Sequence, residues 1–112
     1  MTTPSINRSR SRRAVPVPMT LDLTVARRVN LLTVGGDLDL RSHTRLTRVL
    51  ERLEATHRPL VVALDQVTSA DTHGVMPLVE AAARRVALGL PELQFHEPAP
   101  CVTRVLDQLA SV

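Results

Sequence analysis

The chain of 112 residues has almost no aromatic side chains, no lysine and a single cysteine. Phe95 is its one aromatic residue. Platforms for stacking bases or sugars are therefore missing, which argues against single-strand nucleic-acid or carbohydrate binding. Cys101 has no second cysteine to pair with, which excludes an internal disulfide and favours a reducing compartment. No run approaches the roughly 20 apolar residues that cross a bilayer, so we expect a cytoplasmic protein without membrane insertion.

The basic charge is concentrated at the start of the chain. All 14 basic residues are arginine, and four of them lie within residues 1–18, where there is no acid. The other 94 residues hold 10 arginines against 11 acidic residues, a net charge of −1. Because residues 1–18 are also rich in serine and proline, we expect a disordered tail followed by one domain over residues 19–112. We expect no direct nucleic-acid partner, although a nucleic-acid-binding protein that uses this tail is an alternative.

Hydrophobic periodicity predicts seven elements in the order β-β-α-β-α-β-α. The expected strands are 19–25, 31–34, 60–64 and 93–96, and the expected helices are 41–56, 75–88 and 102–109. Gly35-Gly36 is expected to end the second strand, and the uninterrupted apolar run 60–64 is typical of a strand covered on both faces. In the helix over 75–88, Arg84 and Arg85 are expected on the solvated face. The residues expected to face inward there are Leu78, Val79, Ala82, Ala83 and Val86.

The predicted fold class is α/β, with a single domain built on a mixed, mostly parallel four-stranded sheet. The short turn between the first two strands makes them an antiparallel hairpin, and the strand–helix–strand crossovers imply parallel pairing for the others. In open sheets of this kind, sites gather at the carboxyl ends of the parallel strands. Two acidic steps lie at such ends, one over 36–39 and one over 71–74. They are the candidate functional surface.

Three stretches in series resemble the STAS domain family, the module shared by anti-sigma factor antagonists (anti-anti-sigma factors) and the cytoplasmic ends of sulfate transporters. The stretch from Val34 to Asp39 is similar to the family's strand that ends in Gly-Glu-Leu-Asp. The stretch from Leu60 to Asp71 is similar to the strand that runs into Asp-Ser-Ser-Gly. Residues 100–110 are similar to the closing helix Pro-x-Val-x-Arg-x-Leu, and the whole match keeps its order over residues 19–112.

The antagonist branch of this family implies a protein-binding switch and not an enzyme. In that branch an anti-sigma factor serine/threonine kinase phosphorylates the first hydroxyl after the aspartate. The unphosphorylated antagonist binds the kinase and frees a sigma factor, and the phosphorylated antagonist lets go. The resemblance makes Thr72 the phospho-acceptor, with no cofactor and no metal. The implied partner-binding residues are Asp39, Asp71, Thr72, His73 and Gly74.

The sequence departs from the family pattern around the acceptor. Thr72 stands in place of the usual serine, His73 in place of a second hydroxyl, and Met76-Pro77 in place of a small and apolar pair. Because proline lacks an N–H and clashes with the carbonyl four residues back, we expect the helix to begin at Gly74 or Val75.

The alternative function is a STAS domain without a working phospho-switch, a constitutive binding subunit of a transporter ATPase or a multi-STAS complex.

Each of these residues also has a structural interpretation. Helix N-caps commonly use a hydroxyl or a carboxylate, so Thr72, Asp39 and Asp71 could each cap a helix. Two carboxylates beside one hydroxyl could also hold a magnesium ion. His43 and His73 could join the carboxylates, but their spacing matches no standard ligand motif. We therefore expect His73 to be a surface residue of a binding loop.

Overall fold

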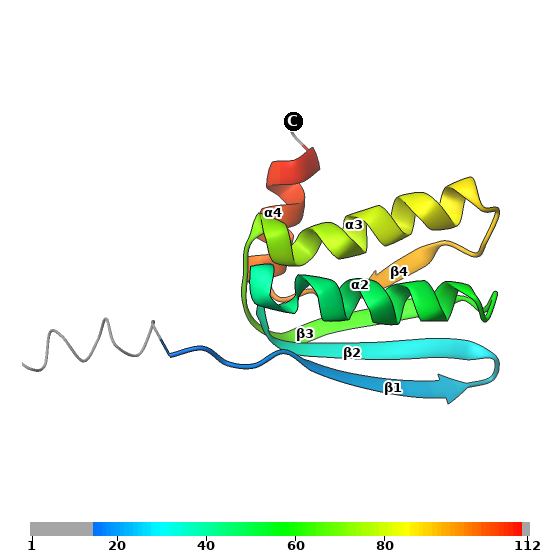
Figure 1. Ribbon diagram of the computed structural model, residues 1–112, viewed down its shortest axis with the longest axis horizontal. Helices are drawn as coiled ribbons and strands as arrows, with labels where there is room; N and C mark the ends of the chain where they lie inside the picture. Colours follow the sequence, from blue (N-terminus) through cyan, green and yellow to red (C-terminus); the bar gives the residue numbers. More distant parts are fainter. Residues whose placement is uncertain (1–14, 111–112) are drawn as a thin grey trace, which may run out of the picture.

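The computed structural model describes residues 15–110 as four strands and three helices in one domain (Figure 1). The elements in chain order are β1 (Thr20–Ala26), β2 (Val29–Leu38), α2 (Leu40–Glu54), β3 (Leu60–Ala70), α3 (Thr72–Ala87), β4 (Leu93–His96) and α4 (Pro100–Ala110). This order is the one that the sequence predicts. Most of the expected tail, residues 1–14, lies outside the described residues.

The four strands form one mixed sheet in the order β1-β2-β3-β4. Strands β1 and β2 are antiparallel, and β2, β3 and β4 run parallel, so the predicted sheet is confirmed. Arg27 and Arg28 make the turn between β1 and β2, and both have a positive φ, of 52° and 65°. Two consecutive residues with positive φ give a tight hairpin turn whose twist matches the twist of the strands.

Two strands are longer than their hydrophobic runs. β2 continues through Gly35-Gly36 to Leu38, and β3 continues to Ala70, so the prediction that the glycines end β2 is wrong. The pairing of β2 with β3 shifts register on either side of Gly36, which has a φ of 79°. A Cβ on Gly36 would collide with the backbone carbonyl of Pro18. The glycines therefore permit an irregularity inside the strand and a close crossing of another chain segment.

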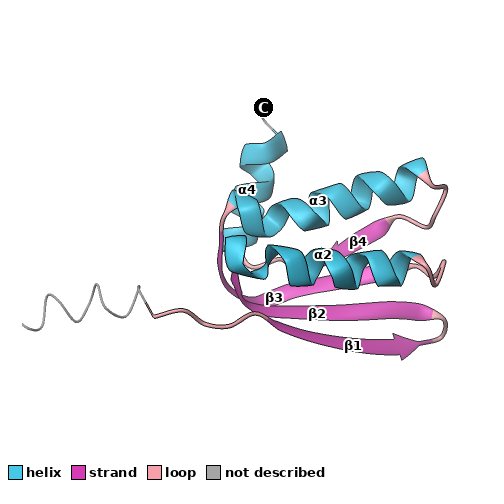
Figure 2. Ribbon diagram, viewed as in Figure 1, coloured by secondary structure: helices cyan, strands magenta, loops and turns pink. Residues whose placement is uncertain are grey.

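Helices α2 and α3 lie side by side over one face of the sheet (Figure 2). The side chains on that face of the central strands are fully buried, and they include Leu32, Val34, Leu60, Val62 and Leu64. Leu31 and Val61 are paired neighbours on the opposite face, where Leu31 is 36% exposed and Val61 is partly buried. The expected complete cover of the strand 60–64 on both faces is therefore wrong at Val61.

Helix α3 begins at Thr72, so the expected start at Gly74 or Val75 is wrong. Pro77 lies inside the helix. In a regular helix the missing N–H of Pro77 would have bonded to the carbonyl of His73. His73 is in the first turn and is exposed, so water can satisfy that carbonyl. One lost hydrogen bond at the solvent-exposed start is a smaller cost than a lost bond in a buried turn.

Arg85 of α3 is fully buried, which contradicts its predicted place on the solvated face. It shares a helix stripe with Leu78 and Ala81, both of which are buried as well. Its guanidinium donates to the carbonyl oxygens of Pro91 at 3.0 Å and Arg58 at 3.2 Å. Val86, which was expected to face inward, is 66% exposed. Ala83 is exposed as well, whereas Leu78 is buried as expected. The expected inward face is therefore wrong at Ala83 and Val86, because the buried stripe includes an arginine.

The last helix, α4, packs its Val102 and Val105 side chains against the core. The N–H of Ala99 just before it donates to the carbonyl oxygen of Leu64 at 3.1 Å, which ties the start of α4 to β3. None of the helices within residues 15–110 has both the length and the apolar content needed to span a bilayer.

Candidate functional site

The two acidic strand ends meet at one edge of the sheet. The N–H of Asp71 donates to the carbonyl oxygen of Leu38 at 3.0 Å, which joins the end of β3 to the end of β2. The backbone of Gly74, in the first turn of α3, lies directly against Leu38 and Asp39, and a Cβ at Gly74 would overlap their backbone atoms. This glycine therefore allows the starts of α2 and α3 to lie next to each other. The predicted convergence of the two acidic steps is confirmed.

Asp71 is the N-cap of α3. Its side-chain Oδ1 accepts from the backbone N–H of Gly74 at 2.9 Å, and its carbonyl oxygen accepts from Val75 at 3.0 Å. The cap interpretation of Asp71 is therefore confirmed. Thr72 is the first residue of the helix and not its cap. Its side chain is exposed, and its hydroxyl has no hydrogen-bond partner within residues 15–110.

Asp39 is the N-cap of α2 and forms an ion pair at the same time. It makes a capping box with Ser42, whose Oγ accepts from the Asp39 N–H at 3.1 Å. Its Oδ2 lies 2.8 Å from a terminal nitrogen of Arg41. This hydrogen bond from Arg41 is the main cause that lowers the pKa of Asp39 below its usual value. Asp39 therefore remains ionised at neutral pH beside the first turn of α3.

The two histidines near the strand ends make no metal centre. His43 in α2 is half-buried and His73 in α3 is exposed. Across the described part of the chain, no group of three or more histidine, cysteine, aspartate or glutamate side chains is arranged to hold a metal ion. Thr72 has no neighbouring base bonded to its hydroxyl among these residues, so the geometry does not form an activated nucleophile.

Asp37 is a central residue of this edge that the sequence did not single out. Its Oδ1 accepts from the hydroxyls of Thr68 at 2.6 Å and Ser69 at 2.8 Å. Its Oδ2 accepts from the N–H of Val17 at 2.8 Å. The Thr68 hydrogen bond is the main cause that lowers the pKa of Asp37. The sequence offered one signal for this role, because Asp37 is an acidic residue two positions before Asp39. In the sheet, the end of β2 that carries Asp37 faces Thr68 and Ser69 of β3.

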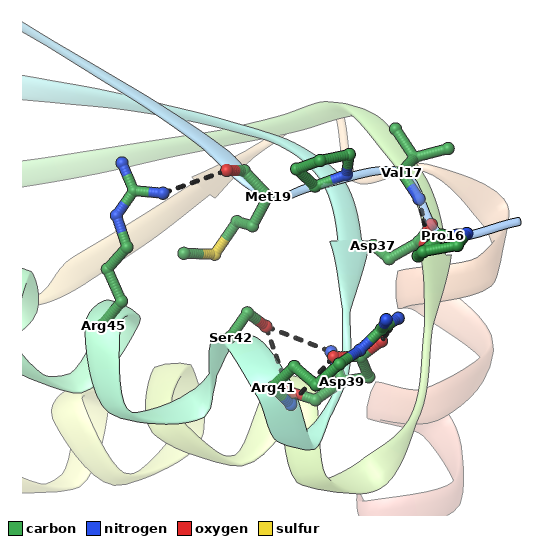
Figure 3. A pocket seen from close by; sticks show the side chains of 9 residues that line it. Pro16, Val17, Met19, Asp37, Asp39, Arg41, Ser42 and Arg45 are labelled. Carbon is green, nitrogen blue, oxygen red and sulfur yellow. Dashed lines mark hydrogen bonds and ion pairs between the residues drawn. The ribbon is translucent and has the colours of Figure 1, made fainter.

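The segment just before β1 lies along the same edge. The N–H of Asp37 donates to the carbonyl oxygen of Val17 at 2.9 Å, so Val17 and Asp37 bind each other in both directions. The carbonyl oxygen of Met19 accepts from the Arg45 side chain at 3.1 Å. A pocket of about 300 Å³ separates this segment from the start of α2 (Figure 3). Its lining residues are Pro16, Val17, Pro18, Met19, Asp37, Asp39, Arg41, Ser42 and Arg45.

The assembled edge presents an exposed hydroxyl in the first turn of α3, whose start lies next to the start of α2. The first N–H groups of a helix have no partner within the helix, and the helix dipole favours negative charge there. Among the residues that the sequence singled out, Asp71, Thr72 and His73 are exposed, Asp39 is half-buried and Gly74 is buried. The hydroxyl of Thr72 is thus accessible from solvent, at a helix start where an anion is favoured.

No protein-family model matches the sequence, and no curated protein is significantly similar to it. Solved structures do resemble it. An anti-sigma factor antagonist from Mycobacterium paratuberculosis superposes with a TM-score of 0.72 and 18% identity over 87% of this chain and 82% of that one. A STAS domain antisigma-factor antagonist from Rhodobacter sphaeroides gives a TM-score of 0.58 and 17% identity over 70% and 86% of the two chains. The anti-sigma factor antagonist SpoIIAA in its unphosphorylated form gives 0.63 and 14% identity over 80% and 82%. The chain therefore has the STAS fold of these antagonists.

Proposed function

We propose that this protein is an anti-sigma factor antagonist that is switched by phosphorylation of Thr72. In its unphosphorylated form it binds an anti-sigma factor serine/threonine kinase, and this binding frees a sigma factor. It acts as a binding protein and not as an enzyme. Because its proposed partner acts on transcription, the proposal has the protein work in the cytoplasm. The fold that it shares with known antagonists supports the general role.

The position of Thr72 is the observation that carries the proposal. Its hydroxyl is exposed and without a partner among the described residues, so a kinase can reach it without first breaking a structural hydrogen bond. Thr68 and Ser69 lie near the same edge, but their hydroxyls donate to Asp37. Phosphorylation of either of them would disrupt those bonds and bring a phosphate against a carboxylate.

A phosphate on Thr72 would change the charge of the partner surface. Phosphorylation adds about −1.5 to −2 charges at neutral pH. The N-terminus of α3 tolerates that charge because its free N–H groups and its dipole favour an anion. The same charge would stand beside the carboxylates of Asp39 and Asp71 and create a strongly negative edge. A kinase that docks here with a negatively charged surface would then be repelled and would lose direct contact with the hydroxyl.

The partner surface that we propose consists of Asp39, Asp71, Thr72, His73 and Gly74. Gly74 contributes by holding the two helix starts together. Asp39 and Asp71 set the electrostatics of the edge and fix the helix starts through their caps. His73 follows the acceptor on the exposed first turn and is available to the partner.

The test is incubation with an anti-sigma factor kinase and ATP, followed by intact-mass analysis. We expect the mass to increase by one phosphate in the wild-type protein and in Ser69→Ala, and to stay unchanged in Thr72→Val. Ser69→Ala is a matched control because it removes a hydroxyl from the same edge. An unchanged wild-type mass with a kinase that is active on another antagonist would contradict the proposal.

The Thr72→Asp variant separates the switch from the alternative function. If phosphorylation controls binding, the added carboxylate weakens the complex with the kinase, as measured by titration calorimetry. If Thr72→Asp binds its partner as tightly as the wild-type protein, the chain is a STAS domain without a phospho-switch and works as a constitutive binding subunit.

A further inference from the structure

The exposed side of α2 carries four arginines in a single stripe. Arg41, Arg45, Arg48 and Arg52 are separated by four, three and four residues, which places them on one side of the helix, and all four are exposed. We call this set the α2 arginine stripe. Arg41 is paired with Asp39, and Arg45 donates to the Met19 carbonyl oxygen. The side chains of Arg48 and Arg52 have no hydrogen-bond or ion-pair partner within residues 15–110.

The acidic residues of α2 lie away from this stripe. Glu54 points toward α3, where its Oε2 lies 2.8 Å from a terminal nitrogen of Arg84. The side chain of Glu51 makes no hydrogen bond or ion pair with an arginine of the stripe within residues 15–110. The stripe is therefore not neutralised from within its own helix, and it offers two uncommitted guanidinium groups.

An apolar groove lies beside the stripe, between α2 and the strands β1 and β2. Strand β1 is at the outer edge of the sheet (Figure 1). Its volume is about 280 Å³. The aliphatic side chains that line it are Leu21, Leu23, Leu32, Val49 and Leu53. Arg45 and Arg52 of the stripe also line it, and Leu23 is 47% exposed. The molecule therefore has an exposed aliphatic groove with arginine side chains along one edge.

We propose that the groove and the stripe together bind an acidic amphipathic segment of a partner protein. The apolar side chains of that segment enter the groove, and its carboxylates meet Arg48 and Arg52. Arginine suits this role because its planar guanidinium can bind a carboxylate through two parallel hydrogen bonds. Arg48 and Arg52 lie between about two and four turns along α2 from its N-cap Asp39, so they provide a second contact that the proposed phospho-switch does not control.

Other occupants fit the surface less well. A second copy of the chain offers no free helical pair of acids, because the one such pair in residues 15–110 is Glu51 and Glu54, and Glu54 already binds Arg84. Residues 1–14 carry arginines and no acid. A single-stranded nucleic acid would find no aromatic side chain in the groove on which to stack a base.

The test uses the full chain and a fluorescent helical peptide as the probe. The peptide carries glutamates at helical spacing beside a row of leucines, and a matched peptide has glutamine in place of every glutamate. We expect the glutamate peptide to bind about tenfold more tightly than the glutamine peptide to the unmodified protein. Raising the salt concentration should remove most of that difference. Equal affinities for the two peptides would overturn the proposal.

Two double variants locate the binding surface. Arg48→Glu with Arg52→Glu should lower the affinity for the glutamate peptide by about tenfold or more. Arg58→Glu with Arg104→Glu makes the same charge change at exposed arginines outside the stripe, and it should change the affinity by only about twofold. Equal losses in both variants would mean that net charge alone attracts the peptide, and the proposal would fail.

Further measurements distinguish the remaining occupants. Leu23→Ser should weaken binding of both peptides, because it removes an aliphatic side chain from the groove. Thr72→Asp should leave peptide binding unchanged, so failure of the phospho-switch and failure of this surface give different results. Tighter binding of single-stranded DNA or of phosphatidylserine vesicles than of the glutamate peptide, lost in the Arg48→Glu, Arg52→Glu variant, would overturn the assignment to a protein segment.

Discussion

The N–H of Asp71 donates to the carbonyl oxygen of Leu38 at 3.0 Å, and this hydrogen bond joins the ends of two parallel strands. The starts of α2 and α3 follow these strand ends directly. The backbone, and not only side-chain contacts, therefore holds the candidate phospho-acceptor Thr72 close to Asp71 and Asp39. A partner would meet a surface whose shape exists before binding.

Gly74→Ala tests the close approach at this edge. A Cβ at Gly74 would overlap the backbone of Leu38 and Asp39, so one of the helix starts must move. We expect a loss of about 2–3 kcal/mol in the free energy of unfolding, measured by urea denaturation. Gly89→Ala is the control, since nothing lies within 4 Å of its Cβ position and only its φ of 71° opposes the change. That variant should lose about 1 kcal/mol, and an equal loss in both variants would contradict the steric explanation.

The cap at the start of α3 predicts different effects for two adjacent residues. Asp71→Ala removes the side chain that accepts from Gly74 and should lower the free energy of unfolding by about 1 kcal/mol. Thr72→Ala removes an exposed hydroxyl that has no partner among the described residues, and stability should stay within about 0.5 kcal/mol of wild type. Thermal and urea unfolding measure both. A larger loss for Thr72→Ala than for Asp71→Ala would show that the threonine is the cap.

The hydrogen bonds of Asp37 predict a pH dependence of stability. The hydroxyl of Thr68 holds the pKa of Asp37 below 3.8 in the folded protein. As the pH falls, the carboxylate of Asp37 takes up a proton in the unfolded chain before it does so in the folded protein. The stability that ionised Asp37 contributes is therefore fully present above the pKa of the unfolded chain. It is lost as the pH falls through the lower, folded pKa.

Asp37→Asn should remove that contribution. The variant should be less stable than the wild-type protein at about pH 7, and the gap should shrink as the pH falls below about 4. Urea unfolding across this range measures the effect, and Asp65→Asn is the control because Asp65 is exposed. A gap between Asp37→Asn and wild type that stays constant with pH would contradict the role of the carboxylate charge.

Arg85 should be important for stability, and its neighbour Arg84 much less so. The buried guanidinium of Arg85 donates hydrogen bonds to the carbonyl oxygens of Arg58 and Pro91. Burial lowers the pKa of Arg85. Arg85→Ala leaves these carbonyls unpaired and opens a cavity, so we expect a loss of about 3 kcal/mol in the free energy of unfolding. Arg84→Ala breaks a partly exposed ion pair with Glu54 and should cost about 1 kcal/mol. Urea denaturation of the two variants decides the order.

Local periodicity in the sequence determined the order of the elements and the class of the sheet. Alternation over 19–25 and helical spacing over 41–56 depend only on neighbouring residues, so they could be recognised without a tertiary structure. The rule that parallel strands present their carboxyl ends at one edge was enough to bring Asp39 and Asp71 together. The resemblance of three stretches to the STAS domain family pointed to the fold that the solved structures share.

Only the tertiary structure decided what depends on distant contacts. Gly35-Gly36 looked like a strand end, but the backbone of Pro18 crosses there, and the glycines let β2 continue beneath it. Arg85 looked like a solvated residue, yet carbonyl groups from two other segments surround its guanidinium and offset the cost of burial. Asp37 became important because Val17, Thr68 and Ser69 converge on it. A sequence pattern records what one segment prefers, whereas these outcomes depend on which segments meet.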